Sequence, residues 1–384
     1  MEQLPQLFLA ADLARGNQLE NGVLAFAFAN GHGEGKGTAG VYRPRGKRGS
    51  HCIDRAERHY YALSVHKIPV GVLGASGYAG RELSHFISQH PQLTLAFATA
   101  NAQRGETLDL PGASITFIAT EDAPLDQAEL VFSSLPHGAS AEWVARARGA
   151  GARVVDLSTD LRIGNGASED VPYGLTEWQR DAVRAAPVVA NPGCYPTSVL
   201  LALLPLLERD LIAHGGTVSI NSASGVSGAG FSPRLDLLFG EVTENFRAYG
   251  VGNTHRHLNE MRAAVTMLGR DVDLLFTPHL LPTARGILST ITVPLRTALN
   301  APLELWRERY RGERFVEVAE ALPELRQVQR RNVARIAVRP VEHVRTPTLQ
   351  VFCAIDNLVK GAAGQALQNA NLMLGLDETL GLPQ

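Results

Sequence analysis

The chain from residue 67 to about residue 193 alternates short apolar runs with segments of helical periodicity. The runs have the length and composition of strands buried on both faces, and they span residues 68–74, 93–99, 130–135 and 153–157. Two predicted helices, 78–89 and 140–148, lie between them. Strands that alternate with helices are typical of a parallel, doubly wound sheet with right-handed crossovers. This half is therefore predicted to be an α/β Rossmann dinucleotide-binding domain.

From residue 194 onward the pattern changes to β-branched runs with few helices between them. The predicted strands are 217–222, 273–278, 286–294, 335–340 and 348–355, and the predicted helices are 198–211, 257–268 and 302–310. Several strands with few helices indicate an α+β domain with a mainly antiparallel sheet. A final amphipathic helix is predicted over residues 361–374.

Residues 1–66 differ from the rest of the chain. Glycine and basic residues interrupt them, as in the stretches 31–37 and 43–49, and packing residues are sparse there. Such a segment buries too little apolar surface to offset the entropy lost on ordering. We expect a disordered extension, or a misassigned gene start with the true N-terminus near Val65.

Composition narrows the class of protein. The formal net charge of −2 provides no basic field for nucleic acid and no polybasic patch for a membrane. Three widely spaced cysteines form neither a disulfide framework nor a zinc motif, so we expect no metal and a reducing cytoplasm. No apolar run reaches the roughly 18 residues that span a bilayer. A small-molecule substrate is the partner that remains.

A glycine-rich turn follows the first predicted strand and opens the first helix. Its spacing is Gly-x-x-Gly-x-x-Gly, and glycine there lets the backbone approach a pyrophosphate held at the helix N-terminus. The predicted dinucleotide contacts in this turn are Gly74, Ala75, Ser76, Gly77, Tyr78 and Gly80. Pro136, His137 and Gly138 follow the third strand, and we expect them in the same cleft.

The end of the second strand indicates which dinucleotide is bound. An acidic residue there would accept the ribose hydroxyls of NAD. The sequence reads Thr-Ala-Asn-Ala-Gln-Arg over residues 99–104, with no carboxylate and one guanidinium. Arg104 therefore favours a 2′-phosphate and NADP, although a solvated loop charge would look the same.

Cys194 is the candidate nucleophile. It would sit just ahead of the predicted helix 198–211, with Pro196 in the first turn and a kink at Pro205. Unpaired N–H groups and the positive end of the helix dipole lower a thiol pKa there and favour the thiolate. A free cysteine is also often a small buried hydrophobe.

A cysteine nucleophile needs a partner that accepts and returns its proton, and histidine does this near neutral pH. An anionic substrate also needs the paired N–H donors of an arginine guanidinium. His255 and His257, in a His-Arg-His segment, are the candidate acid/base groups, and His279 is expected to be structural. Arg162 and Arg285 are the candidate substrate contacts, and a carboxylate partner is the alternative for each. The small-residue segment 222–230 could close over a ligand or be a linker.

A thiolate beside a nicotinamide can capture an acyl group as a thioester, which a hydride can then reduce. The ordered set of motifs resembles the N-acetyl-gamma-glutamyl-phosphate reductase family, which is related to aspartate-semialdehyde dehydrogenase. The similarity runs from about residue 68 to residue 382. It rests on the segments 74–80, 135–138, 155–162, 189–197, 224–230, 255–257, 277–282, 285–286 and 355–362.

The resemblance implies a Rossmann domain of residues 67–193 and 354–384 and a catalytic and dimerisation domain of residues 194–353. It implies that Cys194 is acylated, that His255 (with His257 second) is the acid/base, and that Asn357 lies near the nicotinamide. Homo-oligomers, dimers or tetramers, are usual in such enzymes. Leu258-Asn259 in place of the family's Thr-Pro, and an added residue at 253–254, weaken the assignment of the histidine.

The activity that the resemblance implies is NADPH-dependent reduction of N-acetyl-L-glutamyl 5-phosphate to the 5-semialdehyde, with release of phosphate, in arginine biosynthesis. Aspartyl phosphate, or a carrier-linked aminoadipyl phosphate of lysine biosynthesis, is the alternative substrate. A non-catalytic nucleotide-binding module is the alternative of another class. The retained cysteine, histidines and arginines weigh against that module.

Overall fold

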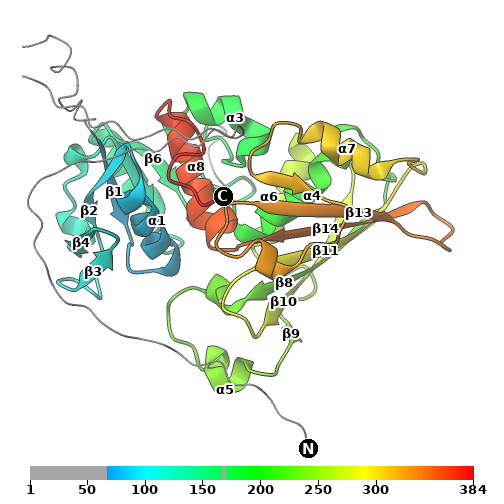
Figure 1. The fold of residues 1–384 in the computed structure, drawn as a ribbon, viewed down its shortest axis with the longest axis horizontal. Coiled ribbons are helices and arrows are strands. Elements are labelled where there is room, and N and C mark those ends of the chain that lie inside the picture. Colours follow the sequence, from blue (N-terminus) through cyan, green and yellow to red (C-terminus); the bar gives the residue numbers. More distant parts are fainter. Residues whose placement is uncertain (1–66, 167–169) are drawn as a thin grey trace, which may run out of the picture. The chain divides into compact units, whose positions relative to one another are not determined.

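The computed structural model describes residues 67–166 and 170–384. The predicted disordered extension of residues 1–66 lies outside the described residues. Two sheets organise the described part of the chain (Figure 1). Both the parallel sheet and the mainly antiparallel sheet predicted from the sequence are confirmed.

The first sheet has five strands in the order β2-β1-β5-β6-β7, and every pair is parallel. Its strands are β1 (Ile68–Leu73), β2 (Leu93–Ala98), β5 (Leu130–Ser133), β6 (Arg153–Asp156) and β7 (Val188–Ala190). Because β2 lies on one side of β1 and β5 on the other, the strand order reverses at β1. Open α/β sheets bind ligands at the carboxyl ends of the strands beside such a reversal.

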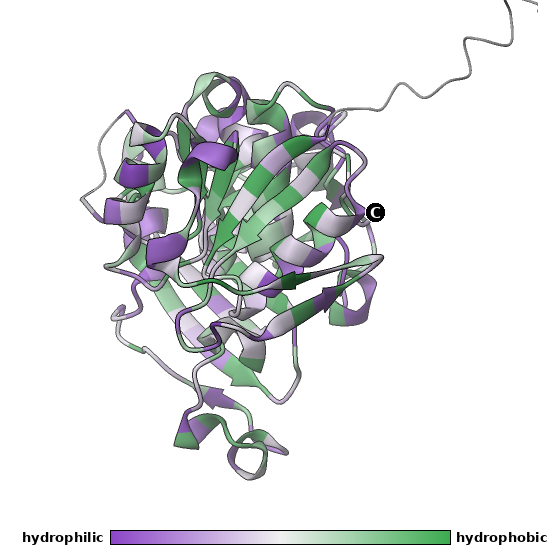
Figure 2. Ribbon diagram, turned by 90° about the vertical axis from the view of Figure 1, so that its left-hand side faces the viewer, coloured by the Kyte–Doolittle hydropathy of each residue, from purple (hydrophilic) through white to green (hydrophobic). Residues whose placement is uncertain are grey.

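Helices cover the first sheet, and a small hairpin follows β2. The helices are α1 (Tyr78–Gln89), α2 (Ser140–Gly149), α3 (Thr176–Ala185) and α8 (Gly364–Met373), and the hairpin is β3 (Thr107–Leu110) with β4 (Ala113–Thr116). Hydrophobic residues gather in the strands and hydrophilic residues on the surrounding helices (Figure 2). Apolar side chains from one face of β1 and β5 pack with apolar side chains of α8 in a single buried cluster.

The second sheet has seven strands in the order β12-β13-β14-β11-β8-β10-β9. The strands are β8 (Thr217–Gly225), β9 (Arg247–Ala248), β10 (Asp273–Leu281), β11 (Ile287–Pro294), β12 (Val316–Val318), β13 (Ala334–Pro340) and β14 (Thr348–Ile355). Four of its pairs are antiparallel, and the pairs β8–β10 and β12–β13 are parallel. The predicted strands 217–222 and 273–278 each extend three residues further.

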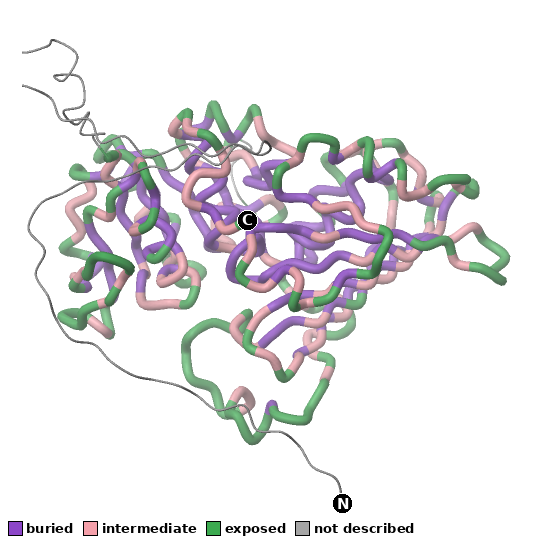
Figure 3. The backbone as a smooth tube through the Cα atoms, in the orientation of Figure 1, coloured by how far each residue is buried: buried purple, intermediate pink, exposed green. Residues whose placement is uncertain are grey.

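The helices that accompany the second sheet are α4 (Cys194–Glu208), α6 (His257–Met267) and α7 (Pro302–Arg309). The central helix, α4, is buried on all sides from Tyr195 to Leu207, as expected for a helix with apolar residues all round (Figure 3). It continues through Pro205, which cannot donate to the carbonyl of Leu201. The Tyr310 hydroxyl donates to that carbonyl at 2.5 Å and so satisfies the buried acceptor that Pro205 leaves without a backbone partner.

The remaining elements are short. They are the α-helix α5 (Phe239–Val242), the 3-10 helices η2 (Thr120–Asp122), η3 (Leu125–Gln127), η4 (Val226–Ala229), η5 (Leu235–Leu237) and η6 (Leu325–Gln327), and the π-helix η7 (Val359–Ala363). The predicted helix 361–374 is therefore part π-helix and part α8. The small-residue segment 222–230 is only partly a loop, because β8 continues to Gly225 and η4 begins at Val226. No helix in the described part of the chain is both long and apolar enough to span a membrane.

Candidate active site

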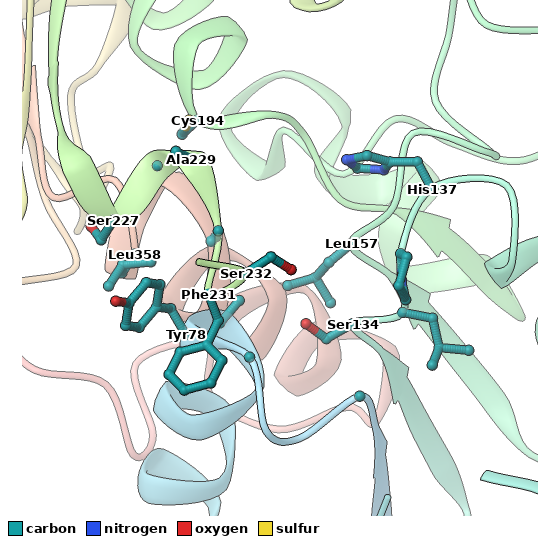
Figure 4. Close-up of a pocket in the computed structure, with 18 of the residues that line it drawn as sticks. Tyr78, Ser134, His137, Leu157, Cys194, Ser227, Ala229, Phe231, Ser232 and Leu358 are labelled. Atoms are coloured by element: carbon teal, nitrogen blue, oxygen red, sulfur yellow. The ribbon is translucent and has the colours of Figure 1, made fainter. Parts of the chain in front are cut away.

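A cavity of about 900 Å³ opens at the carboxyl ends of β1 and β5 and extends to the start of α4. Its wall contains residues of the glycine-rich turn, Cys194 at the start of α4, and a segment just after β8. Figure 4 shows Cys194, His137 and the ring of Tyr78 around this space. Tyr78 packs edge-on against Phe231, with ring centroids 5.3 Å apart. The sequence motifs thus meet in one cavity.

The glycine-rich turn has the shape that a dinucleotide phosphate requires. Gly74 has φ +74°, and a Cβ there would stand 2.5 Å from the Ser134 carbonyl oxygen. Gly77 precedes α1 and leaves its first N–H groups without a side-chain cap. These N–H groups and the helix dipole can therefore hold a pyrophosphate.

The predicted contacts in this turn divide into two kinds. Gly74, Ser76, Gly77 and Tyr78 line the cavity, whereas Ala75 and Gly80 do not. A Cβ on Gly80 would stand 2.4 Å from the Gly74 carbonyl oxygen, so Gly80 permits the close packing of α1 against the turn.

The other predicted cofactor residues divide in the same way. Pro136 and His137 line the cavity, whereas Gly138 lies beside it and donates its N–H to Asp160 at 2.7 Å. Gln103 lines the cavity, but the next residue, Arg104, is exposed and outside the lining.

Asn357 lines the cavity and is held by two hydrogen bonds. Its Oδ1 accepts from the Gly286 N–H at 2.7 Å, and its Nδ2 donates to the Ser227 hydroxyl at 2.9 Å. These bonds connect the end of β14 to the segment that follows β8. The side chain is therefore fixed in the wall of the cavity.

Cys194 is the first residue of α4, with Gly193 as its N-cap, rather than a residue ahead of a helix that starts at Ser198. It is half-buried and faces the cavity. A Cβ on Gly361 would lie 2.8 Å from the Cβ of Cys194, so the π-helix η7 packs directly against the cysteine. The backbone of η7 thereby limits where the sulfur can lie.

The electrostatics of the site correct the prediction that Cys194 is a thiolate in the free protein. Burial raises the pKa of the Cys194 thiol to about 11. This effect is larger than that of the Arg162 charge and the Tyr195 N–H, which both lower the pKa. The helix N-terminus does act in the expected direction, but desolvation outweighs it. The free protein therefore holds a thiol at neutral pH, and its proton must leave when the sulfur reacts.

His257, the second choice of the sequence analysis, lies in the cavity, and His255 does not line it. A Cβ on Gly193, the residue before the cysteine, would be 2.7 Å from the His257 Nε2. Burial and nearby arginines hold the pKa of His257 well below its usual value, so the imidazole is neutral and can accept a proton. His255 instead accepts the backbone N–H of His257 at its Nδ1, at 3.2 Å. His279 stacks on Phe246, outside the lining.

Glu260 is a central residue of the site that sequence reasoning missed. Its fully buried carboxylate accepts hydrogen bonds from Arg162 at 3.0 Å, from the Tyr173 hydroxyl at 2.7 Å, and from the Gly193 N–H at 3.0 Å. It lies one turn after His257 on α6. One carboxylate therefore connects the element that carries the histidine to the turn that carries the cysteine.

The two predicted substrate arginines are both already paired. Arg162 lines the cavity, but its two Nη atoms donate to Glu260 and, at 2.5 Å, to the Leu157 carbonyl. Arg285 lies outside the cavity and pairs with Glu82 of α1 and with Asp356. The alternative of a carboxylate partner therefore holds for both, with Glu260 as the partner of Arg162 and with Glu82 and Asp356 as the partners of Arg285.

Within residues 67–166 and 170–384, no group of three or more histidine, cysteine or acidic side chains could hold a metal ion. The site that the described residues form is thus a dinucleotide cleft joined to a cysteine and a neutral histidine.

Comparison with known families divides the chain much as the two sheets do. Residues 69–186 match the family model described as semialdehyde dehydrogenase, NAD binding domain, and residues 194–357 match semialdehyde dehydrogenase, dimerisation domain. A solved aspartate semialdehyde dehydrogenase II from Vibrio cholerae shares the fold, with a TM-score of 0.67 and 18% identity over 81% of this chain and 99% of that one. Fold and site thus define an NAD(P)-dependent semialdehyde dehydrogenase-type oxidoreductase.

Curated relatives narrow this class further. N-acetyl-gamma-glutamyl-phosphate reductase of Laribacter hongkongensis is 41% identical over 339 residues, which cover 82% of this chain and 98% of the relative. The enzyme of the same name from Geobacter sulfurreducens is 43% identical over 342 residues, with the same coverage. The chain belongs to the N-acetyl-gamma-glutamyl-phosphate reductase family, which confirms the resemblance seen in the sequence.

Proposed function

We propose that the protein reduces N-acetyl-L-glutamyl 5-phosphate to N-acetyl-L-glutamate 5-semialdehyde with NADPH and releases phosphate, a step of arginine biosynthesis. The observation that carries the proposal is the meeting of Cys194, His257 and the glycine-rich turn in one cavity. The names of the curated relatives support this choice of substrate. The protein is proposed to act in the cytoplasm, and the free thiols of Cys194 and Cys353 support a reducing compartment.

The first chemical step is acyl transfer to sulfur. The neutral His257 accepts the thiol proton of Cys194, the sulfur bonds to the acyl carbon, and the bond from that carbon to the phosphate oxygen breaks. His257 is preferred to His255 because its Nε2 faces the residue before the cysteine. The protonated imidazole then has a proton to return when the carbon–sulfur bond breaks at the aldehyde stage.

NADPH, when bound, supplies the hydride that takes the thioester to the level of an aldehyde. Gly74, Ser76, Gly77 and Tyr78 would hold its phosphates, and Asn357 would border its reactive end. Arg104 is exposed one residue beyond the lining, free to pair with a 2′-phosphate. The absence of a carboxylate over residues 99–104 supports NADP over NAD.

The proposal extends to domains and assembly. The dinucleotide-binding domain comprises residues 67–193 and 354–384, and the catalytic domain comprises residues 194–353. The burial of apolar side chains of α8 among residues of β1 and β5 supports this division. The protein is proposed to be a homo-oligomer, dimer or tetramer, which the description of residues 194–357 as a dimerisation domain supports.

The activity is tested in the reverse direction with N-acetylglutamate semialdehyde, phosphate and NADP. Phosphate-dependent formation of NADPH is expected, and its absence would exclude the proposal. Aspartate semialdehyde and an aminoadipate semialdehyde on its carrier are the competing substrates. A higher kcat/KM for either of these would replace the proposed substrate and keep the chemistry.

The two histidines are separated by paired variants. His257→Asn should lower kcat by about two to four orders of magnitude, the usual contribution of a positioned general base. His255→Asn should lower it much less, because that ring contacts the backbone of His257 rather than the cavity. The reverse ranking would restore His255 as the acid/base.

A further inference from the structure

The charge of the cavity wall is one-sided. Among the described residues that line it, two are arginines, Arg162 and Arg256, and none is a carboxylate or a lysine. Both arginines act electrostatically on the Cys194 thiol, so both lie at the end of the cavity where the acyl group reacts. An acyl phosphate that also bears a carboxylate is strongly anionic, and this end of the cavity suits it.

The two arginines are not equivalent. The charge of Arg162 is cancelled by Glu260 at 3.0 Å, in a pair whose side chains are 6% and 0% exposed. The Arg256 guanidinium has no ion pair or hydrogen bond with any residue in the described ranges. The carboxylate that acts electrostatically on Arg256 is that of Glu260, which already accepts hydrogen bonds from Arg162, Tyr173 and Gly193. Among the described residues that line the cavity, Arg256 is therefore the arginine without an ion pair of its own.

The position of Arg256 favours one of the two anionic groups of the substrate. It directly precedes His257, whose Nε2 faces the turn before Cys194, and it also acts on the His137 ring across the cavity. The phosphorus of an acyl phosphate lies two bonds from the carbon that the sulfur attacks, whereas the carboxylate lies at the far end of the side chain. Arg256 is exposed as well, which leaves a route by which released phosphate can reach solvent.

Resting on the proposed function, we infer that Arg256 binds the phosphoryl group of the acyl phosphate, and inorganic phosphate in the reverse reaction. A guanidinium offers two parallel donors to phosphate oxygens and keeps its charge throughout the pH range of activity. Arg162, through its pair with Glu260, positions the turn before the cysteine instead of supplying a free charge.

The test measures KM values in the reverse direction for Arg256→Gln and Arg256→Lys. The KM for phosphate should rise at least about tenfold in Arg256→Gln. It should rise less in Arg256→Lys, which keeps the positive charge but lacks the two parallel N–H donors of the guanidinium. The KM values for semialdehyde and NADP should change less than about twofold. Arg262→Gln is the matched control, because Arg262 is exposed on α6, the helix that Arg256 directly precedes, and lies outside the cavity. An unchanged KM for phosphate, or a rise confined to the semialdehyde, would overturn the inference.

A second readout needs no turnover. Inorganic phosphate alone should slow the alkylation of Cys194 by iodoacetamide in the unchanged protein and in Arg262→Gln, but not in Arg256→Gln. Equal protection in all three proteins would exclude Arg256 as the phosphate ligand. Because this readout does not depend on the reaction, it judges the inference even if the assay of activity on the proposed substrate fails.

Discussion

Gly193 determines how closely the base can approach the nucleophile. A Cβ at this position would lie 2.7 Å from the His257 Nε2 and 2.9 Å from an Arg162 Nη. The same residue donates its N–H to Glu260 at 3.0 Å. A single hydrogen atom in place of a side chain therefore lets a histidine, an arginine and a carboxylate surround the residue before Cys194.

Gly193→Ala should lower kcat at least about tenfold, because His257 and Arg162 must move to accept a methyl group. Overpacking of this kind typically costs about 1–3 kcal/mol of unfolding free energy. Steady-state kinetics and thermal melts measure the two effects. The control is Gly149→Ala at the end of α2, where a Cβ would have nothing within 4 Å, so this change should lower neither kcat nor the melting temperature. Full activity in Gly193→Ala would contradict the close contact.

The pH dependence of Cys194 follows from its raised pKa. At a pKa of about 11 the thiolate fraction grows tenfold per pH unit from pH 7 to pH 10. The alkylation rate of the free protein should grow in parallel, with no plateau near pH 7 to 8, and Cys194→Ser should abolish this pH-dependent labelling. A plateau near neutrality would show that the helix N-terminus outweighs desolvation after all.

Among the elements, the π-helix η7 joins the dinucleotide domain to the nucleophile. Gly361 packs on Cys194, and the adjacent Lys360 forms a fully buried ion pair with Glu177 of α3 at 2.7 Å. Lys360 also donates to Gln368 of α8 at 2.8 Å. The pair therefore ties α3, α8 and η7 together behind the reactive cysteine.

Lys360→Met should destabilise the protein by about 3–5 kcal/mol, because it leaves the buried charge of Glu177 unpaired. Chemical denaturation measures the loss, and adding Glu177→Gln should recover part of it. Glu142→Gln breaks the exposed pair with Arg146 and should cost at most about 0.5 kcal/mol. If Lys360→Met cost no more than Glu142→Gln, the pair would have no structural role.

Local pattern predicted the elements that carry a regular signal. The runs 68–74 and 348–355 formed β1 and β14 because their β-branched and apolar residues match buried strands. The sequence did not reveal α3, since its residues Thr176–Ala185 are mostly polar and its helix depends on packing against α8. It also did not reveal β9, whose two residues pair only because β10 lies beside them.

The site shows the same division between local and long-range information. Cys194 and the glycine-rich turn were predictable because each motif is contiguous. The partner of Arg285 was not predictable because Glu82 lies 203 residues away in the chain. Glu260 was missed because its hydrogen-bond partners Arg162 and Gly193 lie 98 and 67 residues away in the chain. Pairings of this kind exist only after folding.

Among the described residues, exposed apolar side chains gather in residues 231–246, between β8 and β9. We term this segment the arm. Leu235 and Phe239 are each 83% exposed, and Phe231 and Phe246 are 45% and 57% exposed. The backbone around α5, labelled in Figure 1, is mostly coloured as exposed in the same orientation in Figure 3. Exposed apolar patches of this kind often mark contacts between proteins. The arm is therefore a candidate contact in the proposed homo-oligomer.

Leu235→Asp combined with Phe239→Asp should lower the mass measured by light scattering, because two charges would have to be buried in the contact. Leu322→Asp, an exposed apolar position outside the arm, should leave the mass unchanged. A variant that keeps the mass of the parent protein would exclude the arm from the interface, and a monomeric parent would exclude the oligomer itself.

The proposed reaction requires that the acyl group of the substrate becomes bonded to the sulfur of Cys194. The most direct measurement mixes the protein with N-acetylglutamyl phosphate in the absence of NADPH, quenches it in acid and locates any adduct by mass spectrometry of its peptides. One N-acetylglutamyl group is expected on Cys194, stoichiometric with protein, and none is expected in Cys194→Ser. An adduct on another residue, or a Cys194→Ser protein that still turns over, would contradict the proposed reaction.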